Sequence, residues 1–365
     1  MHRLILAGGG HAHLSVLHAL AAHRSITDVV MITPTVKQTY SGMLPGWMAG
    51  HYSLPDCQID LRPLAEAAGV ELIIDHVAGM DANRRCVALS DGTPLDYGLL
   101  SLDVGGEADL SWLEALGDRL LPIKPLDQFV QRWPKIVTEA TKTSNYHLIV
   151  VGGGAAGVEI VLAAQYAFSK SAPGSAVTLV ASENGILSGH ASAVIRRVRK
   201  LLEQRGITLH ESLAVGVEDG VLLGNGQHLK ADTVIAATGS TPPYWLKTSK
   251  LGLDEHGYIS VDATHRSLTH PKVFSAGDVC ARAETIMTRS GVHAVLAGPV
   301  LAHNLIASMN NGAFIRYRPR KRSLYLLATG PKHAVASWGP LSAAGHWVWH
   351  WKNRIDCGFM NKHKA

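Results

Sequence analysis

The stretch LILAGGGHAHL, residues 4–14, joins an apolar run to three consecutive glycines and then to a segment with helical spacing. A strand that turns through glycines into a helix opens a βαβ unit that binds a dinucleotide, because a pyrophosphate can approach the turn and the helix N-terminus. His13 replaces the third glycine of G-x-G-x-x-G, so this stretch alone also fits a plain tight turn. The predicted phosphate contacts are Gly8, Gly9, Gly10, His11, Ala12 and His13.

The stretch YHLIVVGGGAAGVEIVLAAQYAF, residues 146–168, repeats this order of strand, glycine turn and helix. Each stretch is followed by a second apolar strand, VVMIT at 29–33 and AVTLV at 176–180, as a βαβ unit requires. We therefore expect two nucleotide-sized units in one chain. The complete motif of the second unit is carried by Gly152, Gly154 and Gly157.

The acid that usually ends the second strand and binds a ribose hydroxyl is missing from both units. Thr33, followed by Pro34, stands near that position in the first unit, and Ala181 stands there in the second. Thr33 still offers a hydroxyl group, whereas Ala181 offers no polar atom. The sequence does not choose between NADH and NADPH, and both a working and a vestigial second site remain open.

The segments that follow each unit are also alike. Short strands separated by Asp-Gly or Asn-Gly turns occupy residues 87–105 and 217–239, which predicts two small antiparallel meanders. The late stretch HPKVFSAGDVC, residues 270–280, supplies one more strand and precedes a long helix over about 292–309. We expect the last 50 or so residues to form a β-hairpin and a Trp- and Lys-rich helix.

The composition of the 365 residues suits an α/β enzyme, with 47% hydrophobic residues, 17% charged residues and 36 glycines. A net charge of +5, mixed with acids, argues against a nucleic-acid-binding protein. The absence of a leader or membrane-spanning run predicts a cytoplasmic protein or one bound peripherally at the inner face of the cell membrane. The cysteines lie too far apart to suggest a disulfide framework or zinc site: Cys57, Cys86, Cys280 and Cys357.

Three further motifs carry a resemblance to a known family. The stretches LLSLDVGG at 99–106, VIAATGS at 234–240 and VFSAGDV at 273–279, together with the two glycine turns, resemble the two-dinucleotide-binding-domain flavoproteins of the pyridine nucleotide-disulfide oxidoreductase superfamily. The resemblance implies an α/β fold with two Rossmann-like domains and a short C-terminal hairpin-helix region. The implied division is an FAD domain at 1–108 and 262–312, an inserted NAD(P)H domain at 109–261 and a C-terminal region at 313–365.

The resemblance also implies roles for individual residues. Asp278 would bind the ribityl and phosphate region of FAD, and Glu159 would face the nicotinamide and the flavin, although a glutamate there also simply suits the helix dipole. His293 would lie at a helix N-terminus beside the flavin O2 and N1 edge. Met43, Leu44 and Pro45 would lie against the flavin ring, the alternative being a surface loop. The remaining implied cofactor contacts are Gly105, Gly239, Gly277, Gly291 and Val292.

Within the superfamily, the lack of paired cysteines tells against a disulfide reductase. The chain is similar to type II NADH dehydrogenases and sulfide:quinone reductases, and residues 39–52, 122–133 and 345–360 look like the flavoprotein associated with bacterial selenophosphate synthetase. This resemblance implies an FAD-dependent NAD(P)H:acceptor oxidoreductase whose acceptor is a quinone. Two alternatives stay open: a sulfide- or selenide-oxidising flavoprotein that uses Cys280 or another thiol, and a flavin-bearing partner of selenophosphate synthetase.

Histidines and basic residues raise two further questions. Four histidines on the first helix suggest a metal site, but no carboxylate or cysteine accompanies them, so we expect none: His11, His13, His18 and His23. A basic cluster and a Trp-rich tail fit either a lipid surface or packing over the flavin domain. Their residues are Arg316, Arg318, Arg320, Lys321, Arg322, Trp347, Trp349, Trp351, Lys352 and Arg354.

Overall fold

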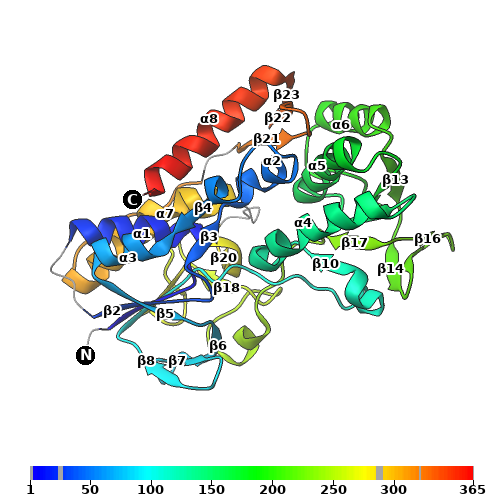
Figure 1. The fold of residues 1–365 in the computed structure, drawn as a ribbon. Helices are drawn as coiled ribbons and strands as arrows, with labels where there is room; N and C mark the ends of the chain where they lie inside the picture. The colour runs from blue at the N-terminus through cyan, green and yellow to red at the C-terminus, as the bar shows by residue number, and fades with distance from the viewer. Residues whose placement is uncertain (1–2, 24–27, 285–290, 320–321, 365) are drawn as a thin grey trace.

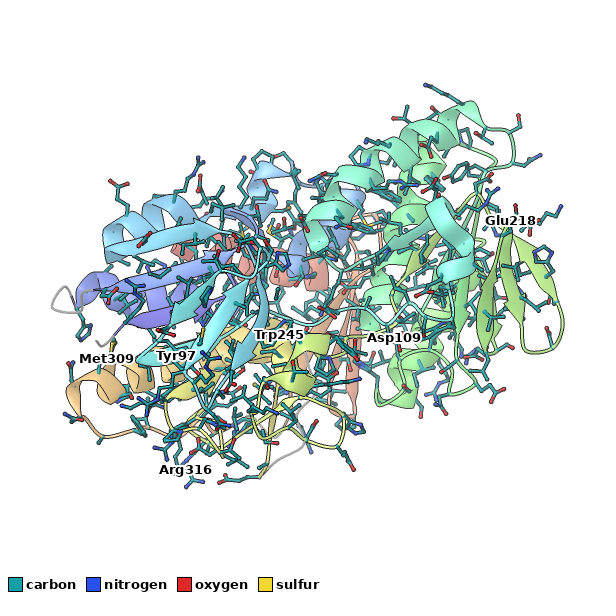
Figure 2. The ribbon with its side chains drawn as sticks, turned by 90° about the horizontal axis from the view of Figure 1, so that it is seen from below. Tyr97, Asp109, Glu218, Trp245, Met309 and Arg316 are labelled. Carbon is teal, nitrogen blue, oxygen red and sulfur yellow. The ribbon has the colours of Figure 1, made fainter. Side chains whose placement is uncertain are left out.

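The computed structural model describes residues 3–23, 28–284, 291–319 and 322–364, which form two α/β units side by side (Figure 1). Figure 2, turned by 90°, also separates the two units, with Met309 and Arg316 toward one end and Glu218 toward the other. The molecule is elongated, with the two units lying one after the other along its length.

The first unit contains a parallel sheet in the order β19-β9-β1-β2-β5. Side chains alternate across β1, so Leu4 and Leu6 pack with the helices while Ile5 and Ala7 face the opposite side. The strands are β1 (Leu4–Ala7), β2 (Val29–Thr33), β5 (Val70–Ile74), β9 (Leu99–Leu102) and β19 (Val273–Ser275), and the helices are α1 (His11–Ala22), α3 (Leu61–Ala68) and α7 (Gly291–Asn310).

The opposite face of this sheet is covered by an antiparallel meander and several short elements. A meander was predicted at residues 87–105, but it begins earlier, at Val77, and β9 in that range belongs to the parallel sheet. The apolar residues of the meander share a cluster with Ile5 and Ala7. Its strands are β6 (Val77–Asp81), β7 (Cys86–Leu89) and β8 (Pro94–Asp96). The short elements on this face are β18 (Ile259–Val261), β20 (Cys280–Arg282), η4 (Tyr244–Thr248) and η5 (Gly277–Val279). The short elements β3 (Lys37–Thr39), β4 (Gln58–Asp60) and η2 (Pro55–Cys57) belong to the helix side, where Cys57 and Ile59 pack.

The second unit repeats this plan. Its parallel sheet has the order β10-β17-β11-β12-β13, and a second meander, β14-β15-β16, packs beside it. The strands are β10 (Leu120–Pro122), β11 (His147–Val151), β12 (Ala176–Ala181), β13 (Thr208–Glu211), β14 (Ala214–Val217), β15 (Gly220–Leu223), β16 (His228–Lys230) and β17 (Thr233–Ala236). The helices are α4 (Leu126–Lys142), α5 (Ala155–Ser171), α6 (Ser192–Gln204) and the turn η3 (Glu114–Arg119).

The two segments that leave the sheets run next to each other. Glu107 and Thr241 exchange backbone hydrogen bonds of 2.9 and 2.8 Å. A Cβ atom on Gly106 would overlap the Ser240 hydroxyl, so the two segments touch closely. This pairing ties the units together at the ends of β9 and β17.

The C-terminal residues extend over both units (Figure 1). They form the antiparallel strands β21 (Leu324–Ala328), β22 (Ala334–Trp338) and β23 (Leu341–Gly345), followed by α8 (His346–His363). The predicted hairpin is therefore a three-stranded sheet, because β23 continues directly from the turn after Trp338. The strands contact α5 and α6 of the second unit, while α8 crosses above α1 and α2 (Leu44–Met48) of the first.

Residues between the second sheet and β19 pack with the first unit. Leu246, Leu251 and Ile259 belong to the apolar cluster under the first sheet. We therefore propose that the inserted unit ends near Ala237 and that residues 246–261 are part of the first unit.

One helix of the described residues, α7, is long and apolar enough to cross a membrane. Half of its apolar stretch is buried inside the protein, and it packs along α1. These contacts are typical of a core helix of the first unit.

Candidate functional site

The first glycine turn is closed by the residue that follows β9. Gly8 has a φ of +94°, and a Cβ atom there would overlap the backbone of Asp103. A Cβ atom on Gly10 would overlap the Asp103 carboxylate. The turn therefore requires glycine at both positions, and Asp103 determines its shape.

The Asp103 side chain is buried, with 4% of its surface exposed, and lies at the N-terminus of α1. Its Oδ2 atom accepts hydrogen bonds from the amides of Ala12 at 2.8 Å and His13 at 3.2 Å. Burial raises the pKa of this carboxyl to about 6, although His11 and the two amides oppose the shift. Asp103 was not among the residues predicted from the sequence motifs.

His13 occupies the space that a third glycine would leave open. Its Nδ1 atom lies 2.6 Å from the Gly8 carbonyl and must donate to it, so Nε2 accepts from the Ser101 hydroxyl at 2.8 Å. The side chain is fully buried, and burial lowers the pKa of His13 to about 4. His13 is a neutral bridge between α1 and the sheet, so we assign it the task of supporting the turn.

The first turn fits a nucleotide. Among the residues that the structure describes, the amides of Gly10 and His11 have no acceptor, and the buried Nε2 atom of His11 has no partner. Thr33 lies under Gly9 and donates its hydroxyl to the Thr35 carbonyl at 2.9 Å. Free amides and an unpaired imidazole nitrogen beside a helix N-terminus are suited to a phosphate group.

Asp278 lies on the far side of the same turn, in η5. The ammonium of Lys124 donates to its Oδ2 atom at 2.7 Å. Lys124 precedes α4 of the second unit, so this ion pair joins the two units beside the first turn. Gly277 has a φ of +76°, and a Cβ atom there would overlap Oδ1 of Asp103. Asp278 and the first turn are therefore brought together.

The second turn has the regular glycine geometry. Gly152 has a φ of +131°, and a Cβ atom there would overlap the Ala237 carbonyl. A Cβ atom on Gly157 would overlap the Gly152 carbonyl, so this glycine lets α5 approach β11. Gly154 begins α5 and has open space beside it. The site keeps the form that a dinucleotide requires, with buried Ala181 where a ribose-binding acid usually stands.

The stretch after Tyr40 is buried between the two units. Met43 packs in the core of the first unit, and Leu44 packs in the core of the second. Trp47 contacts both cores, and Pro45 is buried as well. The stretch is therefore not a surface loop, and α2 forms part of the interface.

A largely buried acid–lysine cluster lies at the same interface. Glu159, on the second turn of α5, accepts from the Ala328 amide at 2.7 Å. The ammonium of Lys352 donates to the Gly42 carbonyl at 2.7 Å and to Asp356 at 2.9 Å. The hydroxyl of Tyr40 donates to Asp356 at 3.2 Å. We call Tyr40, Glu159, Lys352 and Asp356 the interface cluster.

The cluster shifts the pKa values of its members. Burial raises the pKa of Glu159 to about 7, against the attraction of Lys352. Burial alone would lower the pKa of Lys352, but Asp356 and Glu159 together raise it above its ordinary value. Glu159 therefore changes its charge near neutral pH while Lys352 stays positive.

His293 lies in α7, on a different element from Glu159. It is buried in the first turn of α7, with Nδ1 3.4 Å from the Tyr317 hydroxyl and Nε2 3.4 Å from the Ser323 hydroxyl. Burial lowers the pKa of His293. Gly291 and Val292 begin the same helix, and Gly291 lies against Ser41. No hydrogen bond or ion pair within the described part of the chain joins His293 to Glu159.

The glycines that follow β9 and β17 are open. Gly105 has a φ of +73° and Gly239 a φ of +102°, and neither has an atom within contact distance of an added Cβ. The space beside these two glycines, where the paired segments join the two units, is available to a ligand.

The four cysteines are free thiols. Burial raises the pKa of Cys57 to about 12 and also raises those of Cys86 and Cys357. The Cys280 thiol is half-buried and donates to the carbonyls of Ser275 at 3.5 Å and Gly277 at 3.7 Å.

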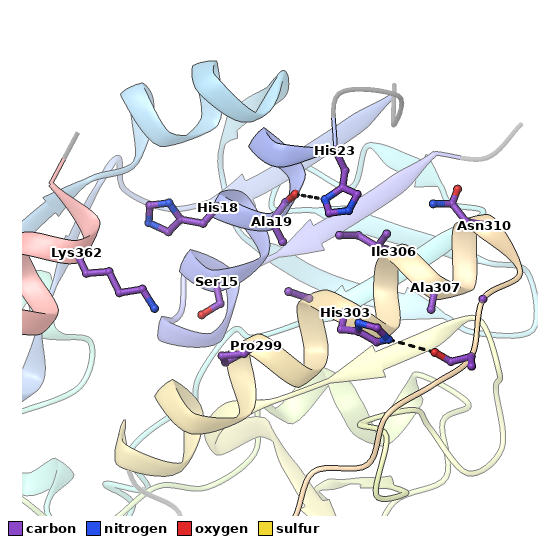
Figure 3. Close-up of a pocket in the computed structure, with 13 residues that line it drawn as sticks. Ser15, His18, Ala19, His23, Pro299, His303, Ile306, Ala307, Asn310 and Lys362 are labelled. Atoms are coloured by element: carbon purple, nitrogen blue, oxygen red, sulfur yellow. Dashed lines mark hydrogen bonds between the residues drawn. The ribbon is translucent and has the colours of Figure 1, made fainter.

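A groove of about 620 Å³ lies along the C-terminal half of α1, between α7 and the end of α8 (Figure 3). Its wall carries His18, His23, His303 and Lys362, and none of the predicted site residues lines it. The Nε2 atom of His18 lies 2.9 Å from the Nδ1 atom of His363, within hydrogen-bond distance. Within the described ranges, no three His, Cys, Asp or Glu side chains are arranged to hold a metal ion.

Several site residues escaped the sequence analysis. Asp103 differs from Ala237 at the matching position of the second unit, and that difference was a readable signal. The pairs of Lys124 with Asp278 and of Lys352 with Gly42 join residues far apart in the chain, and no local pattern reports them.

Comparison with known proteins supports the architecture. The NADH dehydrogenase-like protein YutJ of Bacillus subtilis is 23% identical over 292 residues, which cover 77% of each chain. The sulfide:quinone oxidoreductase of Aquifex aeolicus has a TM-score of 0.81 at 16% identity, covering 100% of this chain and 92% of its own. NDH2 of Plasmodium falciparum, solved with NADH, has a TM-score of 0.81 at 13% identity, covering 98% and 97%.

The family described as pyridine nucleotide-disulphide oxidoreductase matches residues 2–298. This range contains both glycine turns, the two paired segments after β9 and β17, and Asp278. The fold class and the resemblance expected from the motifs are confirmed. This chain belongs to the pyridine nucleotide-disulphide oxidoreductase family and is an oxidoreductase whose cofactors are FAD and NAD(P)H.

Proposed function

We propose that this chain is an FAD-dependent NAD(P)H:quinone oxidoreductase, with FAD in the first unit and NAD(P)H in the second. When bound, FAD supplies the two-electron chemistry that links NAD(P)H to an acceptor. The observation that carries the proposal is the interface cluster, which combines an acid of near-neutral pKa with a fixed lysine between the two nucleotide turns.

The chain's own groups would hold the cofactors at defined places. The free amides of Gly10 and His11 would bind a phosphate of FAD, and Asp278 would bind its ribityl region. Gly105 and Gly239 leave open space at the crossing of the units, and Met43, Leu44 and Pro45 form an apolar wall. The N-terminus of α7, at Gly291 and Val292, offers the positive end of its dipole, and neutral His293 lies in the same turn.

A quinone acceptor sets a proton requirement. NAD(P)H gives up a hydride, which is two electrons and one proton, whereas a quinol carries two added protons, so one proton must come from solvent. Glu159 is half-buried, lies at the interface and has a pKa of about 7, so it can hold that proton below this pH. We assign Glu159 the role of proton carrier and Lys352 that of a nearby positive charge that limits the rise in the pKa of Glu159.

The test compares Glu159→Gln with the exposed control Glu203→Gln. We expect wild-type quinone reduction with NADH or NADPH to fall as the pH rises through about 7, because Glu159 loses its proton. The Glu159→Gln variant should lose this step and turn over more slowly by about 10²-fold. Reduction of ferricyanide, which takes up no proton, should change little. An unchanged quinone profile in Glu159→Gln contradicts the role of Glu159.

The alternative of sulfide or selenide oxidation through a cysteine has less support. Such chemistry needs a thiol of low pKa beside the flavin, but burial raises the pKa of Cys57, Cys86 and Cys357. Cys280 remains the candidate thiol. A Cys280→Ser variant that loses turnover would favour this alternative, and a copurifying selenophosphate synthetase with negligible NAD(P)H oxidation would favour a partner role.

A quinone acceptor also suggests contact with a lipid surface. Large apolar side chains are exposed on α8 and on the nearby strand turn: Trp338, Leu341, Trp347, Trp351 and Ile355, which are 41–60% exposed. Trp347 and Trp351 stack at 6.5 Å between ring centres, and exposed Arg354 and Lys362 share the helix. Arg322 is exposed and lies beside Gly339, which follows Trp338 in the turn. Arg316 pairs with Glu284. Arg320 and Lys321 lie outside the described residues.

We propose that this Trp-rich face of α8 docks peripherally on an anionic membrane, as aromatic and basic residues on one helix face do. The Trp347→Ser/Trp351→Ser variant should sediment with anionic phospholipid vesicles about tenfold less than the wild type. Tyr244→Ser, at an aromatic residue that is 73% exposed elsewhere, is the control. Equal sedimentation of all three proteins would contradict the docking face.

A further inference from the structure

The two glycine turns differ by one acidic group. The carbonyls of Asp103 and Ala237 lie in the same place, since each would overlap a Cβ on the first glycine of its turn, Gly8 or Gly152. The second turn thus has a methyl group where the first has a buried carboxyl. The acid is therefore a feature of the FAD turn and not of the fold.

The two oxygens of this carboxyl have different surroundings. Both amide hydrogen bonds, from Ala12 and His13, go to Oδ2. Oδ1 has no hydrogen-bond partner among the described residues. An added Cβ on Gly10 would meet both oxygens, whereas one on Gly277 would meet Oδ1 alone. These glycines belong to the segments that approach the phosphates and ribityl chain of the cofactor in this family. Oδ1 is therefore the oxygen that faces the cofactor.

We propose that Asp103 binds FAD as a neutral carboxylic acid, with Oδ1–H donating to a phosphate oxygen while Oδ2 keeps its two amide bonds. An ionised carboxyl would instead place a negative charge beside the pyrophosphate in a buried site. FAD binding then takes up one proton from solvent, which remains on Asp103. The proposal rests on FAD occupying the first turn.

Within the described ranges, few other titratable groups lie around Asp103. His11 and His13 face it from α1, and Asp278 faces it from η5. Lys124 is the ion-pair partner of Asp278. Burial lowers the pKa of both histidines, so they are neutral at the pH values of interest. Since burial holds the pKa of Asp103 at about 6 before any phosphate arrives, the acid is largely ionised in the flavin-free protein at neutral pH.

The test is a titration of the flavin-free full chain with FAD at several pH values, in which flavin fluorescence reports binding. The FAD dissociation constant should rise about tenfold per pH unit above the pKa of Asp103, because each binding event needs a proton. Asp103→Asn should remove the slope and bind more tightly than the wild type at high pH. His11→Gln, the matched control in the same turn, should keep the slope. A slope that survives Asp103→Asn, or that His11→Gln abolishes, overturns the proposal.

Calorimetry on the wild type gives a second measurement that does not depend on the folding of a variant. Binding enthalpies of FAD in two buffers of different ionisation enthalpy report the number of protons taken up. We expect nearly one proton per FAD at a pH about one unit above the pKa of Asp103. Binding without proton uptake overturns the role of Asp103 alone, whereas a chain that binds no FAD overturns the cofactor assignment.

Discussion

His13 and Asp103 of the first unit stand where the second unit has two small residues, Gly157 and Ala237. His13 fills the space between α1 and the sheet with an imidazole whose two nitrogens are both hydrogen-bonded. The glycine motif predicted the turn, and the departure at residue 13 was visible in the sequence. Its consequence was not, because the partner hydroxyl of Ser101 comes from a strand far along the chain.

The His13→Gly variant should therefore not behave like a restored motif. It removes a buried side chain and leaves the Ser101 hydroxyl without a partner, so we expect a loss of about 2–4 kcal/mol in the free energy of unfolding. Ala21→Gly on the same helix controls for the flexibility of glycine, which costs about 1 kcal/mol. Denaturant unfolding of both variants makes the comparison. A His13→Gly variant as stable as Ala21→Gly would show that the imidazole bridge contributes nothing.

Glu159 should also affect stability in a pH-dependent way. Its pKa of about 7 in the folded protein lies above its ordinary value of 4.5, so the folded state binds the proton more tightly. The wild type should therefore lose stability relative to Glu159→Gln as the pH rises from about 4.5 to 7, by about 1–3 kcal/mol. Thermal unfolding of both proteins across this range measures the difference. A constant difference would mean that the pKa of Glu159 is not raised.

At the scale of elements, the regular strands and helices were predictable from apolar runs and glycine turns. The interface role of α2 and α8 was less so. Tyr40 stacks on Phe359 at 4.5 Å between ring centres, and both rings contact His11. Such contacts join the two ends of the chain, so local spacing does not report them. The sequence left α8 open between a lipid surface and packing, and its two faces are suited to both.

Lys352 anchors the buried face of α8. Lys352→Ala should cost about 3–5 kcal/mol, because it leaves Asp356 buried without its cation. Replacing both residues, with Lys352→Met and Asp356→Leu, should recover most of that loss, since neither half of the ion pair is then left buried without its partner. Lys362→Ala, at an exposed lysine of the same helix, is the control and should change little. If Lys352→Ala were as stable as Lys362→Ala, the interface cluster would not hold α8.

For the whole molecule, the repeat of two βαβ units predicted both parallel sheets, and the Gly-Asp motif placed Asp278 beside the first turn. The arrangement of one unit against the other was not predictable in detail. It depends on the paired segments at Glu107 and Thr241 and on the Lys124–Asp278 ion pair, each of which joins distant parts of the chain. The resulting interface brings the two nucleotide turns, α2 and the interface cluster together.

The central claim is that FAD lies on the first turn and receives electrons from NAD(P)H on the second. Anaerobic titration of the purified holoprotein with NADH and with NADPH, followed by the visible absorbance of the flavin, tests it most directly. We predict a yellow protein whose flavin absorbance is lost stoichiometrically with at least one of the two nucleotides. A protein that retains no FAD when FAD is supplied, or whose bound flavin stays oxidised with both nucleotides, would contradict the account.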